Sequence, residues 1–193
     1  MIKKLLSVIP AVAFVLSVSA FAGAQEFSAD MVSREGNEVT NAKIYVGHER
    51  VRMEMSDSIM IMLLDKKITW IIMPSDEMYM EQSFDPSLMP KVSTEFDGET
   101  GRVPMGTEVV DGQTADKFKI TYVDNGKTVS AYQWLRGQIP VKTEAEDQSW
   151  STEYKNIEIA TQPADLFEPP ADYKKFDMPS MGDMFKDMGN MIP

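Results

Sequence analysis

Two apolar runs joined by a short charged turn constrain the fold of this chain more than any other stretch. Residues 59–64 read IMIMLL and residues 68–73 read ITWIIM, with Asp65, Lys66 and Lys67 between them. Three charges in the middle argue against one buried helix, and the β-branched and aromatic residues favour strand. Nearly continuous apolar strands are covered on both faces. The sequence therefore predicts a strand hairpin with a cover on each side.

The strands around this hairpin show the alternation of a sheet with one buried face. Residues 50–55 alternate charged and apolar side chains at a two-residue period. Asn125-Gly126 between two alternating segments is a strong hairpin signal. In residues 150–160 the apolar side chains change from even to odd positions. This change predicts either a bulge near Lys155 and Asn156 or a strand with neither face exposed to solvent.

We expect a mainly β fold from these signals. About eight to eleven antiparallel strands, with few helices, should form one strongly curved sheet that rolls toward a barrel, either closed or open on one side. Residues 80–106 are rich in Pro, Gly and acids, so we expect them to interrupt the sheet. Asp85 and Pro86 suit the cap and first position of a short helix there. Such a long connection is often a lid, and it is our candidate to cover the hairpin.

The two ends of the chain differ from its middle. Residues 1–24 have a basic start, an apolar core and the small residues Ala22, Gly23 and Ala24, which together predict a cleaved signal peptide. A membrane anchor is the alternative, but the run is a little short and holds Pro10. We expect residues 25–177 to form the β domain of a soluble periplasmic protein, followed by a Met-rich tail at residues 178–193.

Charge and composition exclude several classes of function. The net charge is −11, which repels nucleic acid and anionic membrane surfaces. The chain has no cysteine, so thiol chemistry and thiolate metal sites are excluded. His48 is the single histidine and falls in an expected turn. The chain therefore lacks the histidines of a multi-histidine metal site, and its one histidine is poorly placed for a catalytic triad. We expect no enzymatic activity and no cofactor.

Methionine is concentrated around the central hairpin, and its flexible thioether suits a lining that adapts to chains of varied length. Ordinary core packing is the alternative for each of these side chains. We predict an apolar ligand lining made of Met53, Met55, Met60, Met62, Trp70, Ile72, Met73, Met78, Met80 and Trp134. Arg50 and Arg52 are candidates to contact a ligand head group, and cross-strand pairing with acidic neighbours is their alternative.

The methionines of the tail recur at spacings of three and four residues, which place them on one side of a helix. Three readings stay open: a lid helix on the barrel mouth, a disordered tail, or a Cu(I) site, because thioether ligands select soft metals. The metal reading would use Met181, Met184 and Met188.

Four strings of the sequence resemble exported bacterial proteins of the superfamily of LolA, the periplasmic lipoprotein carrier. They are KIYVGHERVRMEM at residues 43–55, LLDKKITWIIMP at 63–74, SWSTEYKNIEI at 149–159 and PADLFEPPADYKKFDMP at 163–179. In the last string, Leu-Phe-x-x-Pro-x-x-Tyr closes the domain. The resemblance implies a half-open barrel with a helical lid, and a carrier of lipid or lipoprotein acyl chains. The alternative is an envelope module that binds a protein partner and no ligand.

Overall fold

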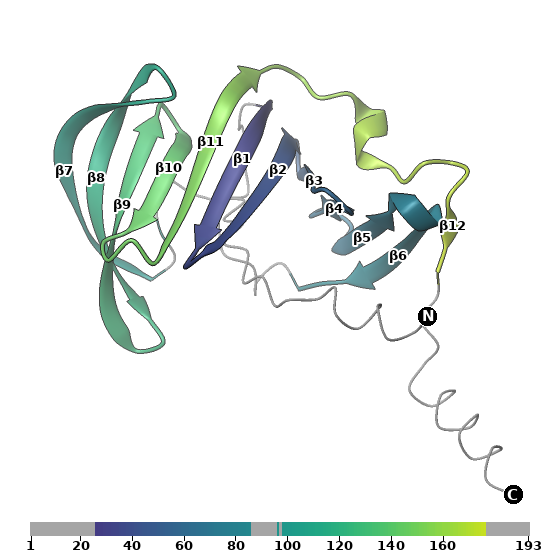
Figure 1. Ribbon diagram of the computed structural model, residues 1–193, viewed down its shortest axis with the longest axis horizontal. Coiled ribbons are helices and arrows are strands. Elements are labelled where there is room, and N and C mark those ends of the chain that lie inside the picture. The colour runs from purple at the N-terminus through teal and green to yellow at the C-terminus, as the bar shows by residue number, and fades with distance from the viewer. Residues whose placement is uncertain (1–25, 86–95, 97, 177–193) are drawn as a thin grey trace, which may run out of the picture.

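The structure is a computed structural model that describes residues 26–85, 96 and 98–176. Its strands form one curved, open sheet (Figure 1). The strands are β1 (Phe27–Glu35), β2 (Glu38–Gly47), β3 (Arg50–Glu54), β4 (Ile59–Leu63), β5 (Ile68–Met73), β6 (Met78–Ser83), β7 (Glu99–Val110), β8 (Gln113–Asp124), β9 (Lys127–Arg136), β10 (Ile139–Ala145), β11 (Trp150–Ile159) and β12 (Lys174–Lys175). Their order across the sheet is β12-β6-β5-β4-β3-β2-β1-β11-β10-β9-β8-β7. The predicted fold class, a strongly curved antiparallel sheet, is confirmed.

Helical structure is sparse in the described residues. It consists of two single 3-10 turns, η2 (Pro74–Asp76) and η4 (Ala164–Phe167). The predicted helix after Asp85 and the Met-rich tail lie outside the described residues, as does the predicted signal peptide. No helix in the described ranges is both long enough and apolar enough to cross a membrane.

Two local predictions are confirmed by the backbone. Asn125 and Gly126 have φ angles of 47° and 76°, the left-handed pair that a tight turn between β8 and β9 requires. In β11 the pairing with β1 shifts between Glu158 and Lys155, so that an extra residue is accommodated beside Asn156, whose φ is 49°. This bulge restores Ile159 to the same face as Tyr154.

The predicted interruption of the sheet at residues 80–106 is too long. Strand β6 continues to Ser83, and β7 begins at Glu99. Pro104 lies inside β7 next to a register shift between Pro104 and Thr107. Proline is tolerated there because β7 is an edge strand with a neighbour on one side only. Composition alone therefore misplaced both strand ends.

The sheet has twelve strands, one more than the upper limit of the prediction. The additional strand is β12, a two-residue strand that pairs parallel to β6, whereas the other neighbouring strands are antiparallel. Residues 160–176 lead from the end of β11 past β3 and β4 to this edge, and we call them the strap (Figure 1). The strap closes one side of the sheet over strands that are distant in sequence.

Candidate functional site

Cross-strand register divides β2–β6 into two faces, because directly opposed residues of antiparallel strands point the same way. One row of partners crosses five strands and is apolar throughout: Ile44, Met53, Met60, Ile71 and Met80. Met73 and Met78 form the neighbouring pair on the same face, and Met62 lies opposite Val51. We call this side of the sheet the Met face.

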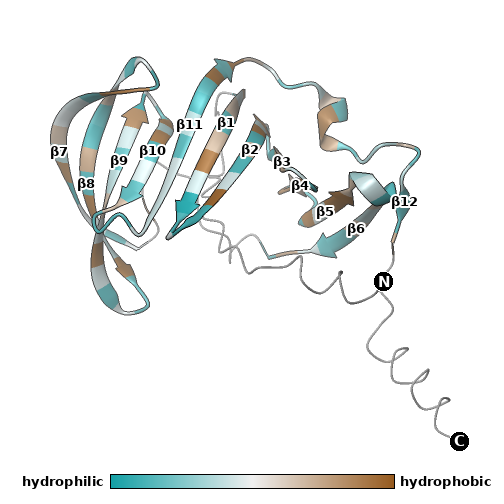
Figure 2. Cartoon of the chain, in the orientation of Figure 1, coloured by the Kyte–Doolittle hydropathy of each residue, from teal (hydrophilic) through white to brown (hydrophobic). Residues whose placement is uncertain are grey.

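Burial on the Met face decreases toward the β6 edge. Met53 and Met62 are 1% and 4% exposed and belong to the main hydrophobic core. Met60 and Met55 are half-buried and pack against that core. Further out, the side chains of β5 and β6 on this face are also half-buried: Ile71, Met73, Met78 and Met80. Figure 2 shows the mostly hydrophobic colouring of β5. The Met face is therefore fully buried at Met53 on β3, and its side chains on β5 and β6 are partly accessible to solvent.

The opposite face of the same strands is packed against the strap. Its central row runs from Tyr45 through Arg52, Ile61 and Trp70 to Glu81. Ile61 is fully buried in a second hydrophobic cluster, together with Leu63, Ile72 and Phe167. The hairpin β4–β5 is therefore apolar on both faces, as its sequence predicts. On this face the cover is the strap, whereas residues 86–95 and 97 of the predicted cover lie outside the described residues.

Phe167 in η4 anchors the strap. Its side chain is 2% exposed, and the guanidinium of Arg50 lies 4.7 Å from the centre of its ring. A Cβ atom added at Gly47 would lie 3.2 Å from Cζ of Phe167, so the missing side chain of Gly47 leaves room for the ring. Arg52 donates a hydrogen bond of 2.8 Å from Nη1 to the carbonyl of Leu166 and forms an ion pair with Glu54.

The far end of the strap is held by Glu81 on β6. Its carboxylate accepts a hydrogen bond from the indole N–H of Trp70 at 2.9 Å and an ion-pair contact from Lys175 at 2.9 Å. These two contacts, with the Trp70 bond the larger, hold the pKa of Glu81 below its ordinary value. The amide of Phe176 also donates to the carbonyl of Tyr79. Backbone and side-chain bonds therefore fix β12 on the sheet edge.

The structure separates the residues predicted to form one site. The strand methionines share the Met face, whereas Trp70 and Ile72 lie on the strap face. Arg50 and Arg52 also lie on the strap face, where Arg50 lies over the ring of Phe167 and Arg52 contacts Leu166 and Glu54. Arg52 thus pairs with an acidic residue of its own strand and not across strands as predicted, and it has a strap contact that its sequence context does not reveal.

Of the remaining two positions, Trp134 belongs to the same hydrophobic core as Met53 and Met62, whereas His48 lies apart from it. Trp134 is 4% exposed, donates from its indole N–H to Glu108 at 2.9 Å, and has the ammonium groups of Lys117 and Lys142 over its ring. His48 is exposed in the β2–β3 turn. Within the described part of the chain, no group of three His, Cys, Asp or Glu side chains is placed to hold a metal ion. The tail residues Met181, Met184 and Met188 lie outside that part.

Sequence reasoning missed the strap as a structural element. Its signal was present in the Leu-Phe-x-x-Pro-x-x-Tyr pattern, which places apolar side chains after the last predicted strand. Leu166, Phe167 and Tyr173 all belong to the strap-face cluster, and the amide of Tyr173 bonds to the carbonyl of Pro170. The pattern that carries the sequence resemblance therefore also builds the cover of β4–β5.

Comparison with known proteins gives a likeness of fold. No family model matches the sequence, and no curated protein matches it. The crystal structure of MucB superposes with a TM-score of 0.56 at 15% identity, over 82% of this chain and 61% of MucB. The Pseudomonas aeruginosa MucA/MucB complex gives 0.51 at 14% identity, over 80% of this chain and 59% of the matched chain.

A domain described as an outer-membrane lipoprotein-sorting protein domain from Vibrio parahaemolyticus also matches, at 11% identity over 75% of this chain and 89% of the domain. Its TM-score is 0.34. The chain spans about three fifths of the length of the MucB chains that it matches. The described residues therefore share the fold of the corresponding part of MucB.

Proposed function

We propose that this chain is an exported, non-enzymatic binding protein that holds an apolar chain, of a lipid or an acylated protein, against its Met face. The observation that carries the proposal is the row Met53, Met60, Ile71 and Met80, which is unbroken by polar residues and becomes half-exposed toward β6. A packed core alone would not need several half-buried thioethers at a sheet edge.

The energetics are compatible with such a ligand. Each buried methylene of an acyl chain contributes about 0.8 kcal/mol, so ten methylenes contribute roughly 8 kcal/mol before the costs of association. Methionine side chains are unbranched and polarizable, so they fit chains of different length without a fixed shape. The proposal needs no reactive group, and the Met face of β3–β6 supplies contact surface rather than chemistry.

The predicted signal peptide at residues 1–24 would deliver the protein to the periplasm, where lipid and lipoprotein chains must be shielded from water. The strap supports the same proposal from the other side. Residues such as Phe167 occupy the opposite face of β4–β6, where Ile59, Ile68 and Trp70 are half-buried beneath the strap, and this leaves the half-buried side chains of the Met face to contact a ligand.

Native mass spectrometry of the exported protein, purified without detergent, tests this function. We expect adducts with the masses of lipids, and uptake of a fluorescent fatty acid after these adducts are extracted. Met60→Gln with Met80→Gln should weaken uptake, whereas Val109→Gln, at a side chain that is 71% exposed on β7, should not. A protein that is empty as purified and takes up no fatty acid would rule the proposal out.

A second candidate function is the binding of a protein partner. It is favoured by one observation, that a protein of similar fold has been solved in complex with MucA(peri). The chain covers 57% of that structure's matched chain, so a shared partner does not follow from the likeness. Affinity capture with the exported protein, before and after delipidation, distinguishes the two functions, since a protein partner should be retained by the delipidated protein.

A further inference from the structure

The methionines of the Met face differ in their exposure to solvent. In the main hydrophobic core, Met31, Met53 and Met62 are 1%, 1% and 4% exposed. Four others, on β4–β6, are half-buried, and we call them the edge methionines: Met60, Met73, Met78 and Met80. Small solutes can therefore reach the sulfur atoms of the edge methionines more readily than those of the core.

Methionine supplies all the sulfur of this chain, which has 16 methionines and no cysteine. An oxidant that reaches the protein therefore meets thioethers and no thiol. Oxidation converts a methionine side chain from a flexible apolar group into a polar, chiral sulfoxide, and dedicated reductases reverse the change. At the edge methionines, this reaction would turn an apolar contact surface into a polar one.

The neighbours of the edge methionines offer few hydrogen bonds to a sulfoxide oxygen. Their partners across the antiparallel strands are apolar, namely one another, Met53 and Ile71. Met78 differs, because it also pairs with the exposed Lys174 on β12. Within the described strands, a sulfoxide at any of the other three positions has no side-chain donor in register with it, so its oxygen depends on water for hydrogen bonds.

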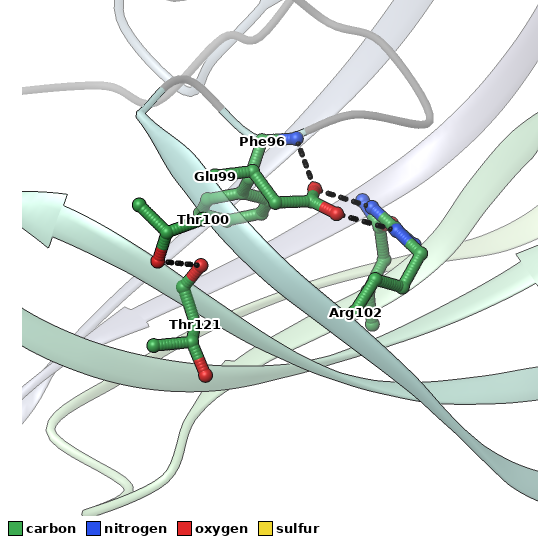
Figure 3. Close-up of polar contacts among 6 residues, drawn as sticks. Phe96, Glu99, Thr100, Arg102 and Thr121 are labelled. Atoms are coloured by element: carbon green, nitrogen blue, oxygen red, sulfur yellow. Dashed lines mark hydrogen bonds and ion pairs between the residues drawn. The ribbon is translucent and has the colours of Figure 1, made fainter.

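The carboxylate of Glu99 on β7 shows how a shielded acceptor is satisfied elsewhere in this sheet (Figure 3). Its side chain is 15% exposed. Arg102 donates from Nε and Nη2 to its two oxygens, each at 2.8 Å, and the amide of Phe96 donates at 2.8 Å. The rows of the edge methionines contain no comparable set of donors in the described strands, so a ligand that covered a sulfoxide there would leave its oxygen unpaired.

We propose that the edge methionines are a site of reversible oxidation, through which a peroxide releases the apolar chain from the Met face. The inference rests on the proposed function and adds the regulation of its site. With hydrogen peroxide, the thioether sulfur attacks one peroxide oxygen, the O–O bond breaks and an S–O bond forms. The sulfur loses two electrons, and the other oxygen leaves as water with both protons of the peroxide.

The effect on binding follows from hydration. In the free protein a half-buried sulfoxide keeps its contact with water, so the fold tolerates it. A bound apolar chain displaces this water and leaves the oxygen without a partner. We expect oxidation of the edge methionines to weaken fatty-acid binding by at least about tenfold, the effect of one unpaired acceptor. The two methionine sulfoxide reductases, one for each sulfoxide epimer, should restore binding.

A peroxide titration of the delipidated wild-type protein tests the proposal. After catalase removes excess hydrogen peroxide, the affinity for a saturated fluorescent fatty acid is measured, and peptide mass spectrometry gives the sulfoxide fraction at each methionine. Affinity should fall in step with sulfoxide at the edge methionines. It should not follow sulfoxide at Met105, which is 52% exposed on β7. Met31 and Met53 should stay reduced, and thermal melting checks that the oxidised protein is folded.

A variant with leucine at all four edge positions separates these thioethers from the rest of the chain, because leucine is apolar and similar in volume but cannot be oxidised. Its affinity before treatment is its own reference, and peroxide should leave that affinity unchanged. The matched control is Met105→Leu, which should lose affinity on treatment as the wild type does. In the wild type, fatty acid bound before treatment should slow oxidation of the edge methionines and not of Met105.

Unchanged fatty-acid affinity in folded wild-type protein whose edge methionines are oxidised would overturn the regulation and leave the proposed function intact, and this result does not depend on any variant. Edge methionines that stay reduced when Met105 is fully oxidised would overturn it as well, as would an equal loss of affinity in the leucine variant. If the untreated protein takes up no fatty acid, the proposed function fails first and the regulation fails with it.

Discussion

Arg52 on β3 donates a hydrogen bond of 2.8 Å from Nη1 to the backbone carbonyl of Leu166, a residue 114 positions further along the chain. Arg52 is 12% exposed at its side chain and also pairs with Glu54 at 2.7 Å. An arginine that points away from the Met face thus ties the C-terminal strap to the centre of the sheet. The head-group role predicted for it from the sequence is not needed to explain its position.

Replacing Arg52 by methionine should loosen the strap, because the carbonyl of Leu166 loses its side-chain donor. We expect a loss of about 1–3 kcal/mol in the free energy of unfolding, the usual cost of an unsatisfied buried polar group. Amide hydrogen exchange at Lys174 and Phe176 should accelerate, since these amides bond to the β6 edge. Arg34→Met, at an exposed position of β1, is the control. Unchanged exchange in the Arg52 variant would contradict the anchoring role.

Phe167→Ala should lower the free energy of unfolding by more than Arg52→Met does. The ring is 2% exposed and joins Ile61, Leu63 and Ile72 in the strap-face cluster. Truncating a buried phenylalanine costs about 3–5 kcal/mol, through lost burial and the cavity that remains. Chemical denaturation measures the change. Val109→Ala, at a side chain that is 71% exposed, should stay within about 0.5 kcal/mol of the wild type. Equal effects of the two variants would show that Phe167 is not an anchor.

Gly47→Ala tests the close approach of the strap to β2. The added methyl group would lie 2.9 Å from Nε and 3.1 Å from Cγ of Arg50, and 3.2 Å from Phe167. Arg50 has to shift, so we expect a destabilisation of about 1–3 kcal/mol by overpacking. Gly101→Ala is the matched control, because its methyl group would meet Thr121 at an ordinary 3.9 Å. A neutral effect at Gly47 would mean that the strap sits further from β2.

Acid should weaken the edge contact between β6 and β12. The folded-state pKa of Glu81 is lowered by Trp70 and Lys175, so Glu81 contributes stability above its ordinary pKa of 4.5 and loses it as pH falls through the lowered pKa. We expect Glu81→Gln to be less stable than the wild type at pH 7, and this difference to close below about pH 4.

Urea denaturation of both proteins from pH 7 to pH 3 measures this difference. Glu38→Gln, at an exposed position at the start of β2, is the control and should show little difference from the wild type at any pH. A gap between the wild type and Glu81→Gln that stays constant down to pH 3 would refute the role assigned to Glu81.

The sequence predicted the mainly β fold because its signals are local. Alternation, the Asn125-Gly126 turn and the parity change near Asn156 each depend on residues within a few positions of one another. The two-sided apolar character of β4 and β5 also follows from consecutive residues. These predictions are confirmed by the register and the backbone angles of the corresponding strands.

The composition of the candidate site could not be predicted in the same way. Parity assigns Met60 and Trp70 to definite sides of their own strands, but relating the two sides requires the pairing Met60–Ile71 and Ile61–Trp70. The cover of the strap face depends on contacts between β3 or β4 and η4, about one hundred residues apart in sequence. Such long-range contacts leave no periodic signal in the sequence. The sequence therefore did not show that Arg50 and Arg52 contact the strap, and both residues looked available to bind a ligand head group.

We propose that the Met face, and no other surface, receives an apolar chain. Methionine methyl groups labelled with carbon-13 report this directly in NMR spectra of the exported protein during a fatty-acid titration, after assignment by single Met→Leu variants. We predict that the resonances of Met60, Met73, Met78 and Met80 shift together and saturably. Unmoved resonances of these four methionines at saturating fatty acid, or shifts confined to methionines elsewhere in the chain, would contradict the account.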